Sequence, residues 1–182
     1  MSRRRAPVIA GAVGAVLVAL LVLLAVADPS TDSASSPLLG RAAPAVHSET
    51  LDGTPFELAR RKGSWVVLNF FNSTCVPCKR EHPELVKFFE SQQALEGTGA
   101  ELYTIVNDDD EDAVRKFFDE QGGGWPIVRD DDASISVKFG VAKVPETWII
   151  SPTGVVAQRF TGQITAELLG EAIAAMSAEP AS

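Results

Sequence analysis

Apolar and polar positions follow two different periods along the chain, and together they predict an α/β domain. Two continuous apolar runs, WVVLNFF (65–71) and AELYTIV (100–106), are typical of strands buried on both faces of a sheet. TWIIS (147–151) and VVAQRFTG (155–162), joined by the turn SPTG, predict a hairpin. Apolar residues recur at helical spacing in three further segments: 77–95, 110–118 and 168–176. Strand and helix signals that alternate in this way favour one sheet with helices packed on it.

The N-terminus has a pattern of its own. Arg3, Arg4 and Arg5 precede an apolar run of 22 residues, 6–27, and no Lys or Arg follows until Arg41. As a helix this run would span about 33 Å, enough to cross a hydrocarbon core of about 30 Å. The positive-inside rule then puts the N-terminus in the cytoplasm. The sequence predicts a single-pass membrane anchor with the rest of the chain outside the cytoplasm.

A cleaved signal peptide is the alternative, because Ala25-Val26-Ala27 resembles a cleavage site. The apolar run is longer than the usual signal-peptide core of about 7 to 15 residues, which favours the uncleaved anchor. Cleavage after Ala27 would give a secreted protein. Either outcome delivers the domain to the outside of the cell membrane.

The segment DPSTDSASSPLLG (28–40) is rich in Ser, Pro and Asp and predicts a flexible tether. The expected organisation is an anchor (1–27), the tether (28–40) and one globular domain (41–182). All 24 acidic residues but only 13 of the 16 basic ones follow Ala27, so the exported part has a net charge of −11 (13 minus 24). Such a charge disfavours nucleic acid as a partner and is typical of a soluble domain.

Both cysteines lie in the stretch FFNSTCVPCKREHP (70–83), where a predicted strand gives way to a predicted helix. Pro77 suits the first helical turn, since its missing N–H costs nothing there. Cys75 is then at the positive end of a helix dipole, which stabilises a thiolate, the attacking species in disulfide exchange. Cys78, one turn further in, is suited to resolve a mixed disulfide.

Two other uses of the cysteines are less consistent with the sequence. A structural zinc site needs two more ligands, and the only histidines, His47 and His82, are not at finger-like spacing. A structural disulfide between residues three apart closes too small a loop to stabilise the fold much. A chain of 182 residues can also bury a core without one. A redox pair is the favoured interpretation.

Further motifs accompany the cysteine pair in a fixed order: VVLNFF with Asn69, CVPCKRE (75–81), LYTIVNDDDEDAVRKFF (102–118), FGVAKVPETWIISPTG (139–154) and the closing helix. On these motifs the chain, over residues 41–177, resembles the TlpA/ResA/DsbE-like branch of the thioredoxin-fold family. These proteins are membrane-tethered thiol–disulfide oxidoreductases and include the cytochrome c maturation reductases. The resemblance implies a thioredoxin-like α/β fold, a central mixed sheet flanked by helices.

The resemblance also implies roles for residues outside the cysteine pair. Pro145, in KVPET, matches the family's cis-proline, which lies against the cysteines, although a proline there could also be an edge-strand breaker. Val144 would present its backbone to a substrate strand. Glu146 would add negative charge near the substrate groove.

Glu81 follows Cys78 by three residues and Cys75 by six, so helical spacing puts the three residues on one line. In the family, a glutamate at this position handles protons as the thiols change state. The alternative is a solvated glutamate favoured by the helix dipole.

The chain departs from the family's FWxxWC pattern, because FFNSTC has Phe71 and Thr74 in place of the two tryptophans. Thr74 brings a hydroxyl beside the nucleophile and is expected to influence thiolate stability and the choice of partner. The reduction potential therefore does not carry over from the family.

The expected function is an extracytoplasmic thiol–disulfide oxidoreductase, a reductase of protein substrates, with apocytochrome c as the first substrate to consider and a membrane thiol reductant as its donor. No metal or cofactor is expected beyond the redox-active disulfide Cys75–Cys78. The alternatives are an oxidant that introduces disulfides and a metal-binding chaperone with thiol ligands. A peroxidase of this fold would be expected to carry P-x-x-x-T-x-x-C, which FNSTCVPC lacks.

Overall fold

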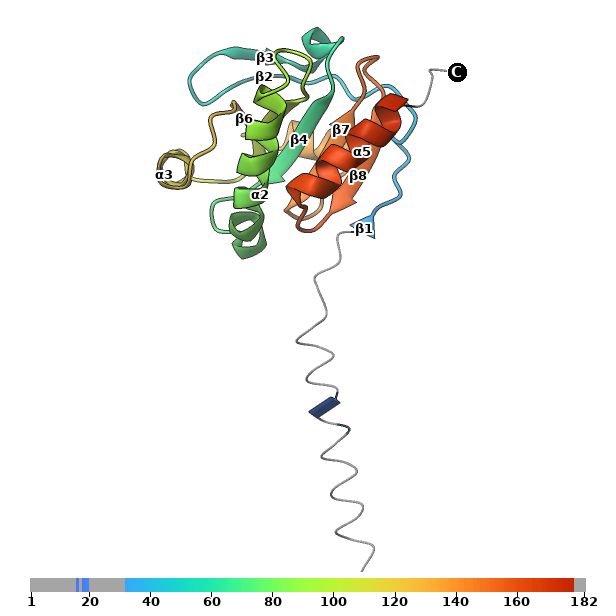
Figure 1. Ribbon diagram of the computed structural model, residues 1–182. Coiled ribbons are helices and arrows are strands. Elements are labelled where there is room, and N and C mark those ends of the chain that lie inside the picture. Colours follow the sequence, from blue (N-terminus) through green and yellow to red (C-terminus); the bar gives the residue numbers. More distant parts are fainter. Residues whose placement is uncertain (1–15, 17, 20–31, 179–182) are drawn as a thin grey trace, which may run out of the picture. The chain divides into compact units, whose positions relative to one another are not determined.

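The computed structural model describes residues 16, 18–19 and 32–178 (Figure 1). The chain divides into two units, Met1–Ser30 and Thr31–Ser182, and the second unit holds the sheet and its helices. The predicted membrane anchor falls on residues outside the described ones, apart from 16 and 18–19. Among the residues that the structure describes, no helix is both long enough and apolar enough to cross a membrane.

The second unit is built around a six-stranded mixed sheet in the order β1-β8-β7-β4-β5-β6. The central strand β4 is parallel to β5 and antiparallel to β7. A separate pair, β2 and β3, is antiparallel. The sheet strands are β1 (Asp32–Ser33), β4 (Val66–Phe71), β5 (Glu101–Val106), β6 (Ile127–Arg129), β7 (Glu146–Ile150) and β8 (Val156–Thr161); the pair is β2 (His47–Glu49) and β3 (Pro55–Glu57).

Helices connect and cover these strands: the short 3-10 helix η1 (Leu58–Arg61), α2 (Val76–Gln93), α3 (Glu111–Gln121), α4 (Ser134–Phe139) and α5 (Ala166–Ala178). The prediction of a mixed sheet flanked by helices is confirmed. The strands predicted at 65–71, 100–106, 147–151 and 155–162 each match an observed strand to within a residue at either end. The helix predicted to reach Leu95 ends at Gln93, and Leu95 is half exposed.

Both faces of the sheet are buried, since the strands alternate their side chains between two apolar layers. One layer joins Val67, Phe71 and Leu102 to α2, α3 and α5, and Figure 1 shows α2 and α5 side by side on this face. The other layer joins Leu68 and Trp148 to β3, η1 and α4. This double burial explains the continuous apolar runs in β4 and β5.

The edges of the sheet are covered by N-terminal segments. β1 pairs with the outer strand β8, and Gly40 N–H donates to the Val156 carbonyl. Residues 32–40, predicted as part of a flexible tether, are therefore attached to the domain, and Leu38 and Leu39 pack against its core. The prediction was wrong for this part because edge pairing and two leucines offset the polar composition. Residues 28–31 lie outside the described part.

Short elements account for most of what the pattern did not predict. Asp130–Asp132 form a turn, in which the Asp130 carboxylate is buried and accepts hydrogen bonds from the backbone N–H groups of Ile135 (2.7 Å) and Ser136 (2.8 Å) at the start of α4. Asp110 caps α3, and its carboxylate accepts the Ala113 N–H at 2.8 Å.

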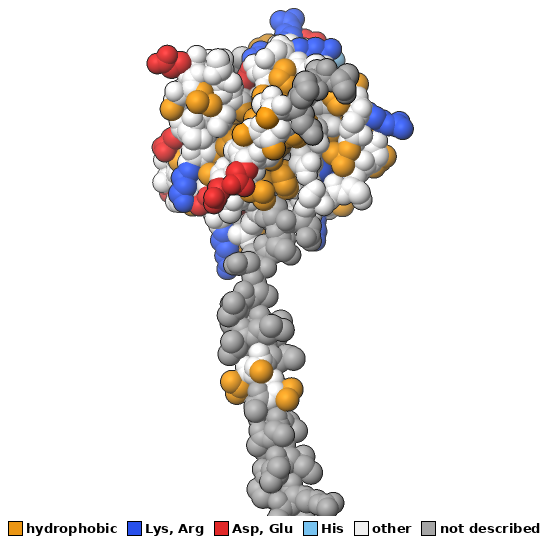
Figure 2. Space-filling view, turned by 45° about the vertical axis from the view of Figure 1, so that its right-hand side comes forward, with side chains coloured by type: hydrophobic (Ala, Val, Ile, Leu, Met, Phe, Trp, Pro, Cys, Tyr) orange, Lys and Arg blue, Asp and Glu red, His pale blue; other side chains and the backbone are white. Residues whose placement is uncertain are grey.

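Acidic and basic side chains are interspersed on the face seen in Figure 2.

Candidate active site

The two cysteines lie where β4 leads through a tight turn into α2. Cys75 is the N-cap of α2, and its Sγ accepts the backbone N–H of Cys78 at 3.1 Å. Pro77 is in the first turn, as predicted. The two sulfurs form a disulfide, in which Cys75 is partly exposed whereas Cys78 is completely buried. A partner can therefore reach Cys75 but not Cys78.

A groove of about 560 Å³ lies beside Cys75. Phe70 and Ile105, from the centre of the sheet, contribute its apolar part. Thr74 and the segment 141–144 also line it, together with Val137 of α4, whose side chain is 75% exposed. The groove offers a surface of mixed apolar and polar groups next to the reachable sulfur.

Pro145, distant in sequence, is brought next to the cysteines. The Val144–Pro145 bond is cis, as the resemblance implied. The Val144 carbonyl oxygen lies 3.7 Å from Cys75 Sγ. Val144 thus lines the groove at its reactive end, the position predicted for contact with a substrate strand.

Glu81 is buried on the same side of α2 as Cys78, one turn away. Its carboxyl oxygens accept hydrogen bonds from the Asn69 amide (2.8 Å) and the Ile164 backbone N–H (3.0 Å). Burial raises the pKa of Glu81 to about 8, and the hydrogen bonds from Asn69 and Ile164 oppose this rise. The solvated-glutamate alternative is wrong, because the side chain is only 1% exposed.

Glu146 does not line the groove. Its carboxylate is buried under Arg159, which donates to both oxygens at 2.9 and 3.0 Å, and Trp148 Nε1 donates to it at 2.7 Å. The Arg159 guanidinium in turn lies over the Trp148 ring, 5.2 Å from its centroid. The substrate-binding role predicted for Glu146 is corrected to a structural one, since the carboxylate is only 2% exposed and already paired.

The two residues that replace the family's tryptophans have different surroundings. Thr74 is exposed at the groove, and its hydroxyl donates to Asn72 Oδ1 at 2.5 Å. Phe71 is buried and packs on the rings of Phe117 and Phe118, with centroids 5.1 and 5.6 Å away. Thr74 therefore remains available to a substrate, whereas Phe71 belongs to the core.

The histidines are accounted for without a ligand role. His47 is exposed, 3.9 Å from a Glu57 oxygen. His82 is packed among Phe117, Phe118 and Trp125, and its Nε2 contacts the Gly122 carbonyl at 2.8 Å. Within the described residues, no three His, Cys, Asp or Glu side chains are grouped to hold a metal ion.

Four polar residues of the site were not predicted to have a role: Asn69, Ser73, Asp109 and Thr147. Asn69 also donates to the Thr147 hydroxyl at 3.1 Å, and both side chains are fully buried. A polar residue inside the apolar run VVLNFF was the signal for Asn69. Asp109 accepts a hydrogen bond from the Ser73 hydroxyl in the turn before Cys75. Nothing in the sequence distinguishes this aspartate from the other acidic residues around it.

Comparison with known proteins identifies the family of the chain. The AhpC/TSA family matches residues 39–159. The chain is 32% identical over 133 residues to thiol-disulfide oxidoreductase ResA of Bacillus subtilis, covering 71% of each chain. It is 32% identical over 139 residues to thiol:disulfide interchange protein HelX of Rhodobacter capsulatus, covering 75% of each.

Solved structures show the same fold. A putative thiol:disulfide interchange protein DsbE from Chlorobium tepidum has a TM-score of 0.67 at 23% identity, covering 80% of this chain and 98% of that one. StoA from Bacillus subtilis has a TM-score of 0.62 at 22% identity, covering 75% and 99%. The chain belongs to the AhpC/TSA family, and it is a thiol–disulfide oxidoreductase of thioredoxin-like fold with its Cys-x-x-Cys pair at the start of α2.

Proposed function

We propose that the protein is a reductase of disulfides in exported proteins, tethered to the outer side of the cell membrane by residues 6–27. The observation that carries the reaction order is the unequal exposure of the two sulfurs, with Cys75 open to the groove and Cys78 buried. The three arginines before the apolar run support the tethered arrangement.

The proposed reaction passes two electrons from the reduced pair to the substrate. The Cys75 thiolate attacks one sulfur of the substrate disulfide, which forms a mixed disulfide and releases one substrate thiolate. Cys78 then loses its proton and attacks Cys75 Sγ. This second step forms the Cys75–Cys78 disulfide and releases the second substrate thiolate. A membrane thiol reductant must then return two electrons to the pair.

Glu81 is proposed to exchange the Cys78 proton. Cys78 has no exposure to solvent, so its proton needs a nearby group inside the protein. Glu81 is buried one turn away on the same side of α2, and a pKa of about 8 lies near that of an ordinary thiol, about 8.5. The two groups can therefore exchange a proton with little difference in free energy.

The groove supports an extended peptide as substrate. Its end nearest Cys75 is the Val144 backbone, which suits pairing with an added strand, and its walls include the exposed Val137. An apolar side chain next to the substrate cysteine would be received there. Apocytochrome c, whose haem-attachment segment is C-x-x-C-H, is the substrate that we propose to examine first.

Trapping tests the reaction order. The Cys78→Ser variant should accumulate mixed disulfides with substrate through Cys75, because no resolving thiol remains, and Cys75→Ser should accumulate none. Equal trapping by both variants, or trapping by Cys75→Ser alone, would reject the assignment. Equilibration with glutathione and dithiothreitol then tests the direction, since a potential near about −270 mV supports a reductant and one near about −120 mV an oxidant.

A further inference from the structure

The turn that carries Cys75 is tied to a loop on the neighbouring strand. Ser73 is buried, with 6% exposure, and both its backbone N–H and its hydroxyl donate to the carboxylate of Asp109. The hydroxyl bond is 2.6 Å long. Hydrogen bonds to an ionised carboxylate are stronger than neutral ones, so this contact restrains the residue two positions before the nucleophile.

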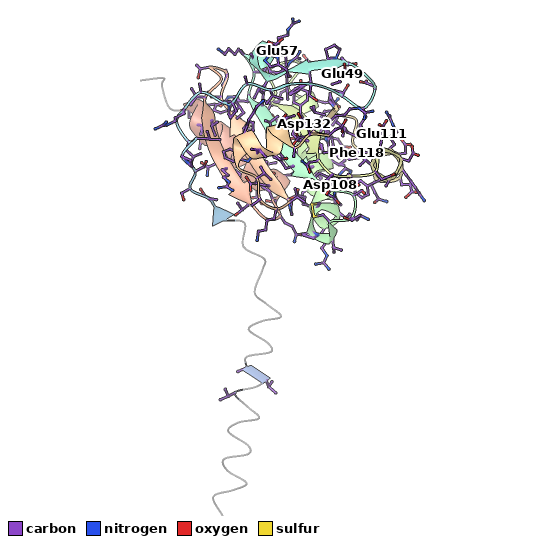
Figure 3. The ribbon with its side chains drawn as sticks, turned by 180° about the vertical axis from the view of Figure 1, so that it is seen from behind. Glu49, Glu57, Asp108, Glu111, Phe118 and Asp132 are labelled. Atoms are coloured by element: carbon purple, nitrogen blue, oxygen red, sulfur yellow. A yellow bond between two sulfur atoms is a disulfide. The ribbon has the colours of Figure 1, made fainter. Side chains whose placement is uncertain are left out.

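A second contact runs in parallel. The Asn72 side-chain amide donates to the Asp108 carbonyl at 3.0 Å, while its Oδ1 accepts Thr74 N–H at 2.9 Å. Asp108 has a φ of 48°, in the left-handed region that Asp tolerates better than most residues. Figure 3 shows Asp108 at the end of the domain where α2 begins. Because β4 and β5 are parallel neighbours, the loops after them meet at this edge of the sheet.

The charge of Asp109 has a consequence for the nucleophile. The N-terminus of α2 stabilises a thiolate at Cys75, whereas a carboxylate bonded two residues upstream destabilises it by like-charge repulsion. Other ionisable groups near Cys75 are Asp108 and Lys143, which line the groove, and Lys79 and Glu81 on α2. Asp109 differs from these groups because its side chain accepts hydrogen bonds from the turn, whereas Asp108 accepts one through its backbone carbonyl.

We propose that Asp109 is a positioning residue for the Cys75 nucleophile: its carboxylate fixes the Ser73 turn, and its negative charge opposes thiolate formation. A less stable thiolate makes the reduced pair a better electron donor. The clamped residue, Ser73, lies between Phe71 and Thr74, the two positions at which the resemblance implies tryptophans. This inference deepens the proposed reductase function and rests on Cys75 as its nucleophile.

The test measures alkylation of Cys75 by iodoacetamide across pH in the reduced exported domain, residues 32–182. Asp109→Asn removes the charge and should move the midpoint of the profile to lower pH, with about three- to tenfold more thiolate below the midpoint. Asp112→Asn is the matched control, since it removes an equal charge three residues away, and its profile should coincide with wild type. An unchanged midpoint in Asp109→Asn, or an equal shift in Asp112→Asn, would overturn the electrostatic part.

The clamp itself is tested by rates of reduction of oxidised glutathione at a pH where Cys75 is fully ionised. Ser73→Ala keeps the Asp109 charge, so the rate should fall several-fold while the alkylation midpoint stays in place. The Ser73→Ala/Asp109→Ala pair should be no slower than Asp109→Ala alone, because the two residues act through one contact. If the double variant were slower than Asp109→Ala by the full factor that Ser73→Ala causes alone, the clamp would be rejected. Alkylation needs no substrate, so failure here is distinct from failure of trapping by Cys78→Ser.

Discussion

The side-chain amide of Asn69 donates a 2.8 Å hydrogen bond to the carboxyl group of Glu81, and both side chains are completely enclosed between β4 and α2. This arrangement keeps a titratable group in the core beside the redox helix. Because burial raises the pKa of Glu81 to about 8, the carboxyl group is mostly protonated at neutral pH and can release or take up a proton in the range where thiols titrate.

The first prediction concerns the pH dependence of the thiols. Glu81→Gln keeps the size and a hydrogen-bonding amide but removes the titrating group, so the pH profile of disulfide closure should lose the inflection that comes from Glu81, near pH 8, and keep only that of the thiols. The rate above that pH should fall about 100-fold, the lower end of the range for loss of a proton-transfer group. Stopped-flow closure of the reduced domain with oxidised glutathione gives both values.

Glu84→Gln is the control for this measurement, because Glu84 is on the same helix, three residues on, and is partly exposed. Its profile should match wild type. Superimposable profiles for Glu81→Gln and wild type would reduce Glu81 to a packing residue.

The second prediction links Glu81 to stability. A glutamate whose folded pKa is raised binds its proton more tightly in the folded state, so its contribution is fully present below the unfolded value of about 4.3 and is lost as pH rises toward 8. The free energy of unfolding should fall by up to about 1.4 kcal/mol per pH unit across this window, and Glu81→Gln should remove the slope. Urea unfolding at several pH values measures it; an equal slope in the variant would contradict the assignment.

The third prediction concerns the effect of His82 on stability at acidic pH. Burial lowers the pKa of His82, and its Nδ1 is enclosed without a hydrogen-bond partner. A depressed folded pKa means that stability is present above the unfolded value of about 6.5 and is lost as pH falls below it. His82→Gln can still donate to the Gly122 carbonyl but does not titrate, so thermal unfolding of this variant should lose less stability between pH 6.5 and 5. A larger loss than wild type would show that protonation of His82 is not responsible.

The fourth prediction concerns the buried pair on β7 and β8. Arg159→Met leaves the Glu146 carboxylate buried without its cation, which should cost about 3–5 kcal/mol in the free energy of unfolding. Adding Glu146→Gln should recover much of this loss, because the neutral amide can still accept from Trp148. Denaturant unfolding measures both variants. If Arg159→Met were as stable as wild type but had a raised KM for peptide, the structural role of Glu146 would be wrong and a substrate-binding role would be supported.

The fifth prediction concerns topology. A reporter fused after Ser36 should be active when it requires export and inactive when it requires the cytoplasm, since the arginines precede the apolar run. Release of a soluble form lacking residues 1–27 would replace the anchor by a signal peptide but leave export in place. Reporter activity in the cytoplasm would contradict both.

Periodicity predicted the parts of the fold in which every position is buried. The runs that became β4 and β5 are apolar throughout because both faces of the sheet are covered, and such runs are visible without any partner. The cysteine pair was predictable for a related reason, since Cys75, Pro77 and Cys78 lie within one helical turn. Strand β6 and helix α4 were missed because three and six residues are too few to establish a period.

Contacts between distant residues were the other limit. Glu146 was predicted to face the groove, and its burial depends on Arg159 two residues away on the paired strand, in a register that the sequence does not state. The Ser73–Asp109 contact likewise joins residues 36 positions apart, and an aspartate in an acidic run has no mark that distinguishes it from its neighbours. Such pairings are decided by how neighbouring strands align, antiparallel for β7 and β8 and parallel for β4 and β5, and local patterns do not record this alignment.

The pairing of β1 with β8 decides where a soluble fragment of this protein should begin. A fragment that starts at residue 41, where the sequence pattern puts the domain boundary, would lose β1, the Ser35 contact of Arg159 and the packing of Leu38 and Leu39. The outer edge of β8 would then expose unpaired backbone groups, the kind of edge that joins another copy in aggregates. A fragment that starts at residue 32 keeps this edge closed, so it is the better choice for purification and crystallisation.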